Sequence, residues 1–163
     1  MAAVARVVAL HRGRAPSGQP PEVSGEPEGM LAPMRMKLEL VPVPVSDVDR
    51  SAAFYEQLGF VRDVDVSPAD GVRVVQLTPP ASACSILLST GLPDIAGMAP
   101  GTVRGLHLVV QDIAAAREEL TGRGIEVGDL VPVGGGVTYA GITDPDGNTL
   151  TLQQMDWRTG DAY

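Results

Sequence analysis

The chain has 163 residues, of which 44% are hydrophobic and 20% are charged, and its net charge is −8. This length suits one domain or two small modules that share a core, and the composition is that of a globular protein. A nucleic-acid groove and an anionic membrane surface are both disfavoured, because each needs clustered Lys and Arg. The single cysteine, Cys84, permits no internal disulfide, and no apolar run is long enough to span a membrane. We therefore expect a cytoplasmic protein without nucleic-acid or membrane partners.

Residues 1–35 are expected to form a disordered leader. Within them, residues 11–33 are rich in Pro, Gly, Ser and Glu and show no hydrophobic periodicity. Such a composition buries too little apolar area to offset backbone ordering, which costs about 1–2 kcal/mol per residue. The folded part of the chain should therefore begin near Met36.

Residues 36–90 alternate between strand and helix patterns. Residues 38–45 alternate as in a strand, although two prolines restrict it to an edge strand or a bulged one. Ser46 and Asp47 offer N-caps to a helix that stops at Gly59. Three strand-like segments follow, at residues 60–66, 72–78 and 84–90. This order predicts a βαβββ module.

The same pattern returns in residues 102–155, after a linker rich in Gly and Pro at residues 91–101. One offset of 65 positions aligns the two copies without a gap, for example Asp47 with Asp112. The second copy should hold a helix and four strands, at residues 112–124 and at residues 104–110, 125–133, 137–143 and 148–154. We therefore predict an α+β fold of tandem βαβββ modules, with a curved mixed sheet around a concave pocket and a C-terminal tail at residues 156–163.

Strand parity divides the side chains of each predicted sheet between two faces. One face should pack against the helices, since both modules keep it apolar; it holds Val41, Val43, Val45, Val75, Leu77, Leu87, Leu106, Leu108, Val110, Ala140, Ile142 and Leu152. The opposite face should line a pocket for a small molecule. The predicted ligand contacts on that face are Leu40, Gln76, Ile86, Leu88, Gly105, His107, Tyr139, Thr151 and Gln153. The alternative is that these side chains pack a core or a dimer contact.

Two segments carry a resemblance to a known family. They are the helix segment VSDVDRSAAFYEQLGF, at residues 45–60, and the turn segment ITDPDGNTLTLQQ, at residues 142–154. Together they resemble the vicinal-oxygen-chelate superfamily of glyoxalases, bleomycin-resistance proteins and dioxygenases. The resemblance extends over residues 36–155 and implies the glyoxalase/bleomycin-resistance fold.

The metal ligands of this superfamily occupy the first and last strands of each module. The resemblance places them seven residues before each helix cap and three after the turn residue Asn148, at Leu40, Gly105 and Thr151, and the repeat offset adds Ile86. Apart from the weak Thr hydroxyl, none of these residues can bind a divalent ion. We therefore predict neither a metal nor another cofactor, and the metal-dependent reactions of the superfamily are not expected.

The sequence therefore favours a binding module, a homodimer that sequesters a small apolar or aromatic molecule as resistance proteins of this superfamily do. One alternative is a glyoxalase-like lyase or isomerase, or a dioxygenase-type enzyme, with a non-standard site. His107 is the best catalytic candidate for such an enzyme, since imidazole is a common general base near neutral pH. The other alternative is an accessory or regulatory subunit.

Overall fold

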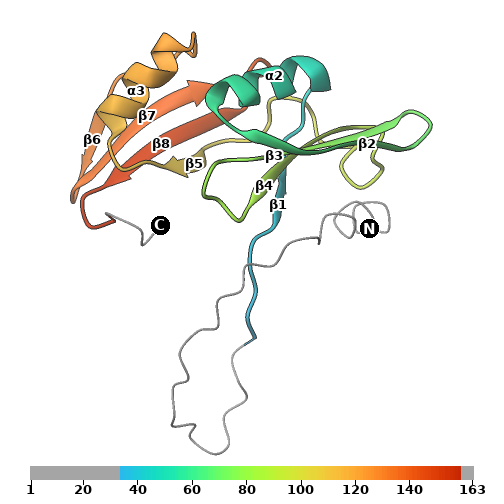
Figure 1. Ribbon diagram of the computed structural model, residues 1–163, viewed down its shortest axis with the longest axis horizontal. Coiled ribbons are helices and arrows are strands. Elements are labelled where there is room, and N and C mark those ends of the chain that lie inside the picture. Colours follow the sequence, from blue (N-terminus) through green and yellow to red (C-terminus); the bar gives the residue numbers. More distant parts are fainter. Residues whose placement is uncertain (1–33, 159–163) are drawn as a thin grey trace, which may run out of the picture. The chain divides into compact units, whose positions relative to one another are not determined.

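The computed structural model describes residues 34–158 (Figure 1). Most of the predicted leader and the end of the predicted tail lie outside these residues. Both modules belong to one compact unit that begins at Glu39. The first module contains β1 (Leu40–Pro42), α2 (Val48–Leu58), β2 (Val61–Ala69), β3 (Val72–Thr78) and β4 (Ser85–Thr90). The second module contains β5 (Leu106–Val109), α3 (Ile113–Gly122), β6 (Val131–Gly134), β7 (Val137–Thr143) and β8 (Thr149–Met155).

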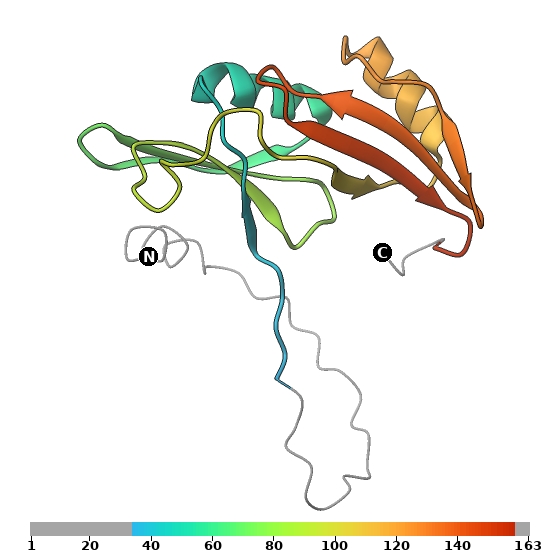
Figure 2. The same cartoon turned by 180° about the vertical axis from the view of Figure 1, so that it is seen from behind.

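The eight strands form two mixed sheets, in the orders β1-β4-β3-β2 and β5-β8-β7-β6. In each sheet the first strand pairs in parallel with the last strand of its module, and the other pairs are antiparallel. Each helix lies across one face of the sheet of its own module (Figures 1 and 2). The predicted α+β fold of tandem βαβββ modules is confirmed. Among the described residues, no helix is long and apolar enough to cross a membrane.

Local capping explains where the helices start and where the first one stops. Asp47 accepts a hydrogen bond from the Arg50 N–H at 3.0 Å, and Asp112 accepts one from the Ala115 N–H at 2.9 Å. Such side-chain caps satisfy backbone donors that have no partner within the helix. Helix α2 ends at Gly59, whose φ of 107° is left-handed and therefore suits glycine. Both N-caps stand where the sequence predicted them.

The register of β4 corrects the predicted faces of this strand. Leu88 and Ile86 pair with Val75 and Leu77 of β3, and all four side chains belong to the buried core under the helices. Leu87, between them, is turned to the opposite face. The sequence assigned Ile86 and Leu88 to the pocket face and Leu87 to the helix face, and these assignments are wrong.

One extra residue in the first module explains the error. Residues 79–84 separate β3 from β4, whereas the shorter segment 144–148 separates β7 from β8. The offset between the modules therefore falls from 65 to 64 in the last strands, so that Ile86 matches Leu150 (150 − 86 = 64). A shift of one residue turns every side chain of a strand to the other face.

The turn between β7 and β8 reaches across to the first module through Asp146. Its side chain is only 6% exposed and lies 2.9 Å from the Arg50 guanidinium. The hydroxyls of Ser51 and Ser46 also donate to this carboxylate, the former at 3.1 Å. Burial alone would raise the pKa of Asp146, but the hydrogen bonds from Ser46, Ser51 and Arg50 outweigh burial and hold the pKa below its usual value.

A second carboxylate of the same turn, Asp144, holds the middle of α2. The Tyr55 hydroxyl donates to Asp144 Oδ2 at 3.1 Å, and Asn148 Nδ2 donates to the same oxygen at 2.8 Å. Asn148 Nδ2 also donates to the backbone oxygen of Pro44, at 2.9 Å, next to β1. Burial and the neighbouring Asp144 charge raise the pKa of Tyr55, so the hydroxyl keeps its proton and remains a donor. We call this group the inter-module anchor: Ser46, Arg50, Ser51, Tyr55, Asp144, Asp146 and Asn148.

Replacing Tyr55 with Phe should lower the free energy of unfolding by about 1–2 kcal/mol, because a buried carboxylate loses one hydrogen-bond donor. Urea denaturation measures this difference. Tyr139→Phe is the matched control, since the Tyr139 hydroxyl makes no hydrogen bond within the described part of the chain. Equal stability of Tyr55→Phe and the native protein would show that the anchor contributes nothing through this bond.

The anchor should also make stability depend on pH through Asp146. Because the pKa of Asp146 is lower in the folded state, its carboxylate stabilises the fold above the unfolded pKa, near 3.9. This contribution is lost as the pH falls below about 4 and through the folded pKa. We expect Asp146→Asn to be about 1 kcal/mol less stable than the native protein at pH 7, with the difference narrowing below pH 4. A difference that stays constant from pH 7 to about 3 would contradict this assignment.

Candidate functional site

Polar and aromatic side chains gather on the side of the second sheet that faces away from α3. His107 pairs with Thr151 across β5 and β8, and Tyr139 pairs with Gln153 across β7 and β8. His107 Nδ1 lies 2.6 Å from Gln153 Oε1, and the His107 and Tyr139 rings meet edge-on with centroids 5.4 Å apart. We call this side of the sheet the open face; its residues are His107, Val109, Tyr139, Gly141, Thr151 and Gln153.

The contact with Gln153 determines how His107 can act. The amide oxygen of Gln153 accepts a hydrogen bond, so Nδ1 of a neutral His107 carries the proton and Nε2 presents an acceptor. His107 is exposed, and Tyr139, Thr151 and Gln153 are half-buried. A Cβ atom added at Gly141 would meet no other atom within 4 Å, so there is space above the middle of the face. The open face can therefore accept a molecule that carries a hydrogen-bond donor.

The predicted ligand contacts are divided among four places. Most of the second-module residues, His107, Tyr139, Thr151 and Gln153, share the open face. Gly105 precedes β5 and has a left-handed φ of 65°, so that any side chain there would strain the backbone. Leu40 and Gln76 lie on the corresponding face of the first sheet, where Gln76 is buried. Ile86 and Leu88 lie in the core and cannot contact a ligand on the open face.

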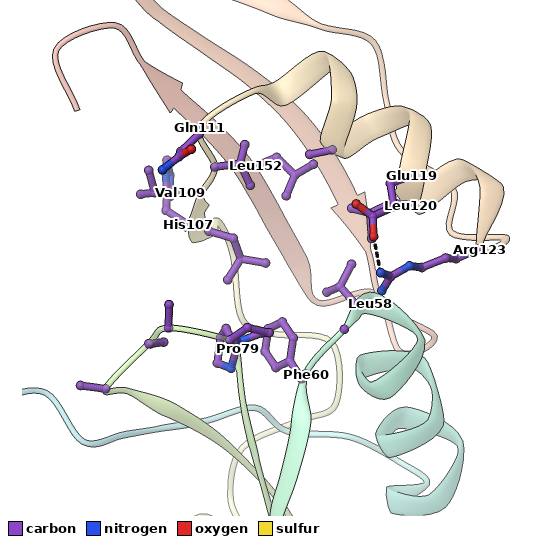
Figure 3. Close-up of a pocket in the computed structure, with 18 residues that line it drawn as sticks. Leu58, Phe60, Pro79, His107, Val109, Gln111, Glu119, Leu120, Arg123 and Leu152 are labelled. Carbon is purple, nitrogen blue, oxygen red and sulfur yellow. Dashed lines mark hydrogen bonds and ion pairs between the residues drawn. The ribbon is translucent and has the colours of Figure 1, made fainter. Parts of the chain in front are cut away.

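A groove of about 820 Å³ lies between the modules, beside the edge strand β5 (Figure 3). Phe60 and Pro79 line it from the first module, and Leu120 and Leu152 line it from the second. His107 is the single predicted ligand contact that also lines this groove. Strand parity could not have found the groove, because it depends on how the two modules pack together.

The polar groups of the groove are few. Gln111 follows β5, and Glu119 of α3 forms an ion pair with Arg123, the residue that follows this helix, shown by the dashed line in Figure 3. The two charges offset each other, so the groove has no strong preference for a charged molecule. Most of the other lining residues are apolar, from the segments Leu58–Phe60, Pro79–Ala83 and Leu108–Val110.

The residues do not fit a metal ion. After the register correction, the four positions that the resemblance implies hold Leu40, Leu87, Gly105 and Thr151. Across residues 34–158, no three His, Cys, Asp or Glu side chains are grouped closely enough to hold a metal ion. No catalytic step through a metal can be derived from this donor set.

The comparisons with known proteins agree with this architecture. The family model of the Glyoxalase/Bleomycin resistance protein/Dioxygenase superfamily matches residues 37–152, and the chain belongs to this superfamily. No curated protein matches the chain.

Solved structures from bacteria are similar along nearly their whole length. The chain is 32% identical to TnmS3, an antibiotic binding protein from Streptomyces sp. CB03234, over 77% of this chain and 100% of that chain, with a TM-score of 0.66. It is 34% identical to a glyoxalase/bleomycin resistance protein from the same source, over 72% and 100% of the two chains, with a TM-score of 0.61. A superfamily member from Sphaerobacter thermophilus is 29% identical over 74% and 98%, with a TM-score of 0.64.

Adjacent substitutions in β8 should separate the core from the open face. Leu152→Asp puts a charge between sheet and helix, at a side chain that is 2% exposed, and should cost about 3 kcal/mol or more of stability. Gln153→Asp changes a half-buried residue of the open face and should keep the native far-UV circular dichroism spectrum and a cooperative melt. If both variants unfolded alike, the assignment of the two faces would be wrong.

Proposed function

We propose that this protein captures a small, mostly apolar or aromatic molecule on the open face and acts by binding rather than by catalysis. The observation that carries the proposal is the combination on one face of an aromatic contact, His107 with Tyr139, and open space over Gly141. The 32% identity to an antibiotic binding protein over its full length supports the same class of function. Capture lowers the concentration of the unbound molecule, as a sequestering resistance protein would.

The chemistry of the face indicates which molecules it would hold. A flat ring system can stack on or meet the edge of the Tyr139 ring, where aromatic contacts add about 0.5–1.5 kcal/mol to burial. A hydroxyl or amide of the ligand can donate to His107 Nε2, because Gln153 occupies Nδ1. The net charge of −8 disfavours an anionic ligand by long-range repulsion.

We further propose that the protein works as a homodimer in the cytoplasm, as the sequence leads us to expect. His107 is exposed and Tyr139 only half-buried, so one open face covers a ligand from one side. A second copy packed over this face would enclose the ligand and bury more of its apolar surface, which strengthens binding.

An enzyme is the second candidate, and one observation favours it. Gln153 holds His107 in a fixed tautomer, as an orienting residue does for a general base. A metal-independent lyase or isomerase could use such a base. Capture and catalysis can be distinguished by what is recovered, because a captured molecule is recovered unchanged whereas an enzyme converts its substrate into a product.

Isothermal titration calorimetry of the full chain with tetracycline and doxorubicin, two small molecules with fused ring systems, tests the proposal. We expect saturable binding of at least one of them, and mass spectrometry should recover that compound unchanged. Thr151→Trp fills the open face and should raise the Kd at least about tenfold. Thr121→Trp, on the exposed surface of α3, is the control and should change the Kd less than about twofold.

Two results would refute capture at this face. One is that neither compound binds the folded protein. The other is that Thr151→Trp binds as tightly as the native chain. Chemical conversion of a bound compound, abolished by His107→Ala, would favour the enzyme instead.

A further inference from the structure

The two modules face each other along two seams that the duplication relates, and the seams are not alike. In the first seam, the turn between β7 and β8 meets α2 through the inter-module anchor. In the second seam, the segment between β3 and β4 faces α3 across the groove. Equivalent parts of the two modules thus form a closed contact on one side and a groove on the other.

The repeat offset shows which residues make the difference. The helix donors Ser51 and Tyr55 correspond to Ala116 and Leu120, 65 positions later. Both of these residues line the groove. Each lacks the hydroxyl that its counterpart donates to the turn, so α3 offers no donor at these two positions in the second seam.

The segment between β3 and β4 likewise lacks the acceptors of the turn between β7 and β8. The acceptors Asp144 and Asp146 correspond to Pro79 and Ala81, 65 positions earlier, and both of these residues line the groove. Ala81 has a positive φ of 63°, which is unusual for a residue other than glycine, and the segment is one residue longer than its counterpart. Donors and acceptors are therefore missing together, and among residues 34–158 no group equivalent to the anchor closes the second seam.

We propose that the groove is a second binding site, for a neutral, flat and mostly apolar ring system. Its volume of about 820 Å³ is in the range of small-molecule sites. Phe60 and Pro79 provide flat apolar surfaces from the first module, and Leu108 and Leu152 line the groove from the second. A ring system between these walls would bury both of its sides, and burial of apolar area strengthens binding.

The polar groups of the groove restrict the ligand further. The exposed amide of Gln111 can form a hydrogen bond with a carbonyl or hydroxyl substituent of the ligand. Gln111 corresponds to Ser46, which donates a hydrogen bond to Asp146 in the first seam. The charges of Glu119 and Arg123 offset each other, so this part of the groove favours a neutral ligand over a charged one. His107 and Val109 are the residues that the groove shares with the open face, and the remaining walls are separate.

Binding of Nile red, a neutral flat fluorophore, to the full chain tests this site. We expect saturable binding of one molecule per chain. Ala83→Trp fills the groove from its exposed loop wall and Ala116→Phe fills it from α3, and each should raise the Kd at least about tenfold. Ala114→Phe, exposed on the same helix and outside the groove, is the matched control and should stay within about twofold of the native Kd.

Thr151→Trp distinguishes this proposal from capture on the open face. Nile red should bind Thr151→Trp normally, whatever that variant does to antibiotic binding. The proposal fails if the native chain shows no saturable Nile red binding, or if Ala83→Trp binds as the native chain does. It also fails if Ala83→Trp turns a dimer into a monomer in sedimentation experiments, because a second copy would then be the occupant. Thermal melts show which variants are folded. If Ala116→Phe does not fold, the result for Ala83→Trp, which lies on an exposed loop, decides whether the proposal holds.

Discussion

The position of the second module against the first depends on the contacts of one carboxylate, that of Asp146. This carboxylate is almost buried, and a buried charge is tolerated only with partners, which Arg50, Ser51 and Ser46 provide from the first module. These partners stand at the start of α2, so the second sheet is held at one defined position against the first helix. Both the closed seam and the groove on the other side follow from that position.

Duplication has produced two modules with the same strand order and different surfaces. On the first sheet, Val74 and Leu87 face away from α2 and are still buried. On the second sheet, the equivalent face carries His107 and Tyr139 and is partly exposed. The backbone hydrogen bonds need the same pairing in both copies, whereas the side chains outside the shared core have been free to diverge. The exposed polar and aromatic side chains of this face are therefore concentrated on the second module.

Membership of a superfamily that includes glyoxalases and dioxygenases does not assign their reactions to this chain. Those folds support many functions, and the function depends on the residues at the site. Here the positions of the metal ligands hold Leu40, Leu87, Gly105 and Thr151, and the neighbouring positions hold a histidine oriented by an amide. This combination supports the proposal that the protein captures a small molecule.

The sequence by itself determined the local features, because these depend on neighbouring residues. Asp47 and Asp112 cap the helices where predicted, and alternation placed His107, Thr151 and Gln153 on one face of the second sheet. Only the tertiary structure decided which side chains of β4 face the helix. An extra residue in an irregular loop leaves no periodic signal in the sequence, yet it turns every side chain of the following strand to the opposite face. The tertiary structure alone revealed the groove, which depends on contacts between residues about a hundred positions apart, such as Ser51 and Asp146.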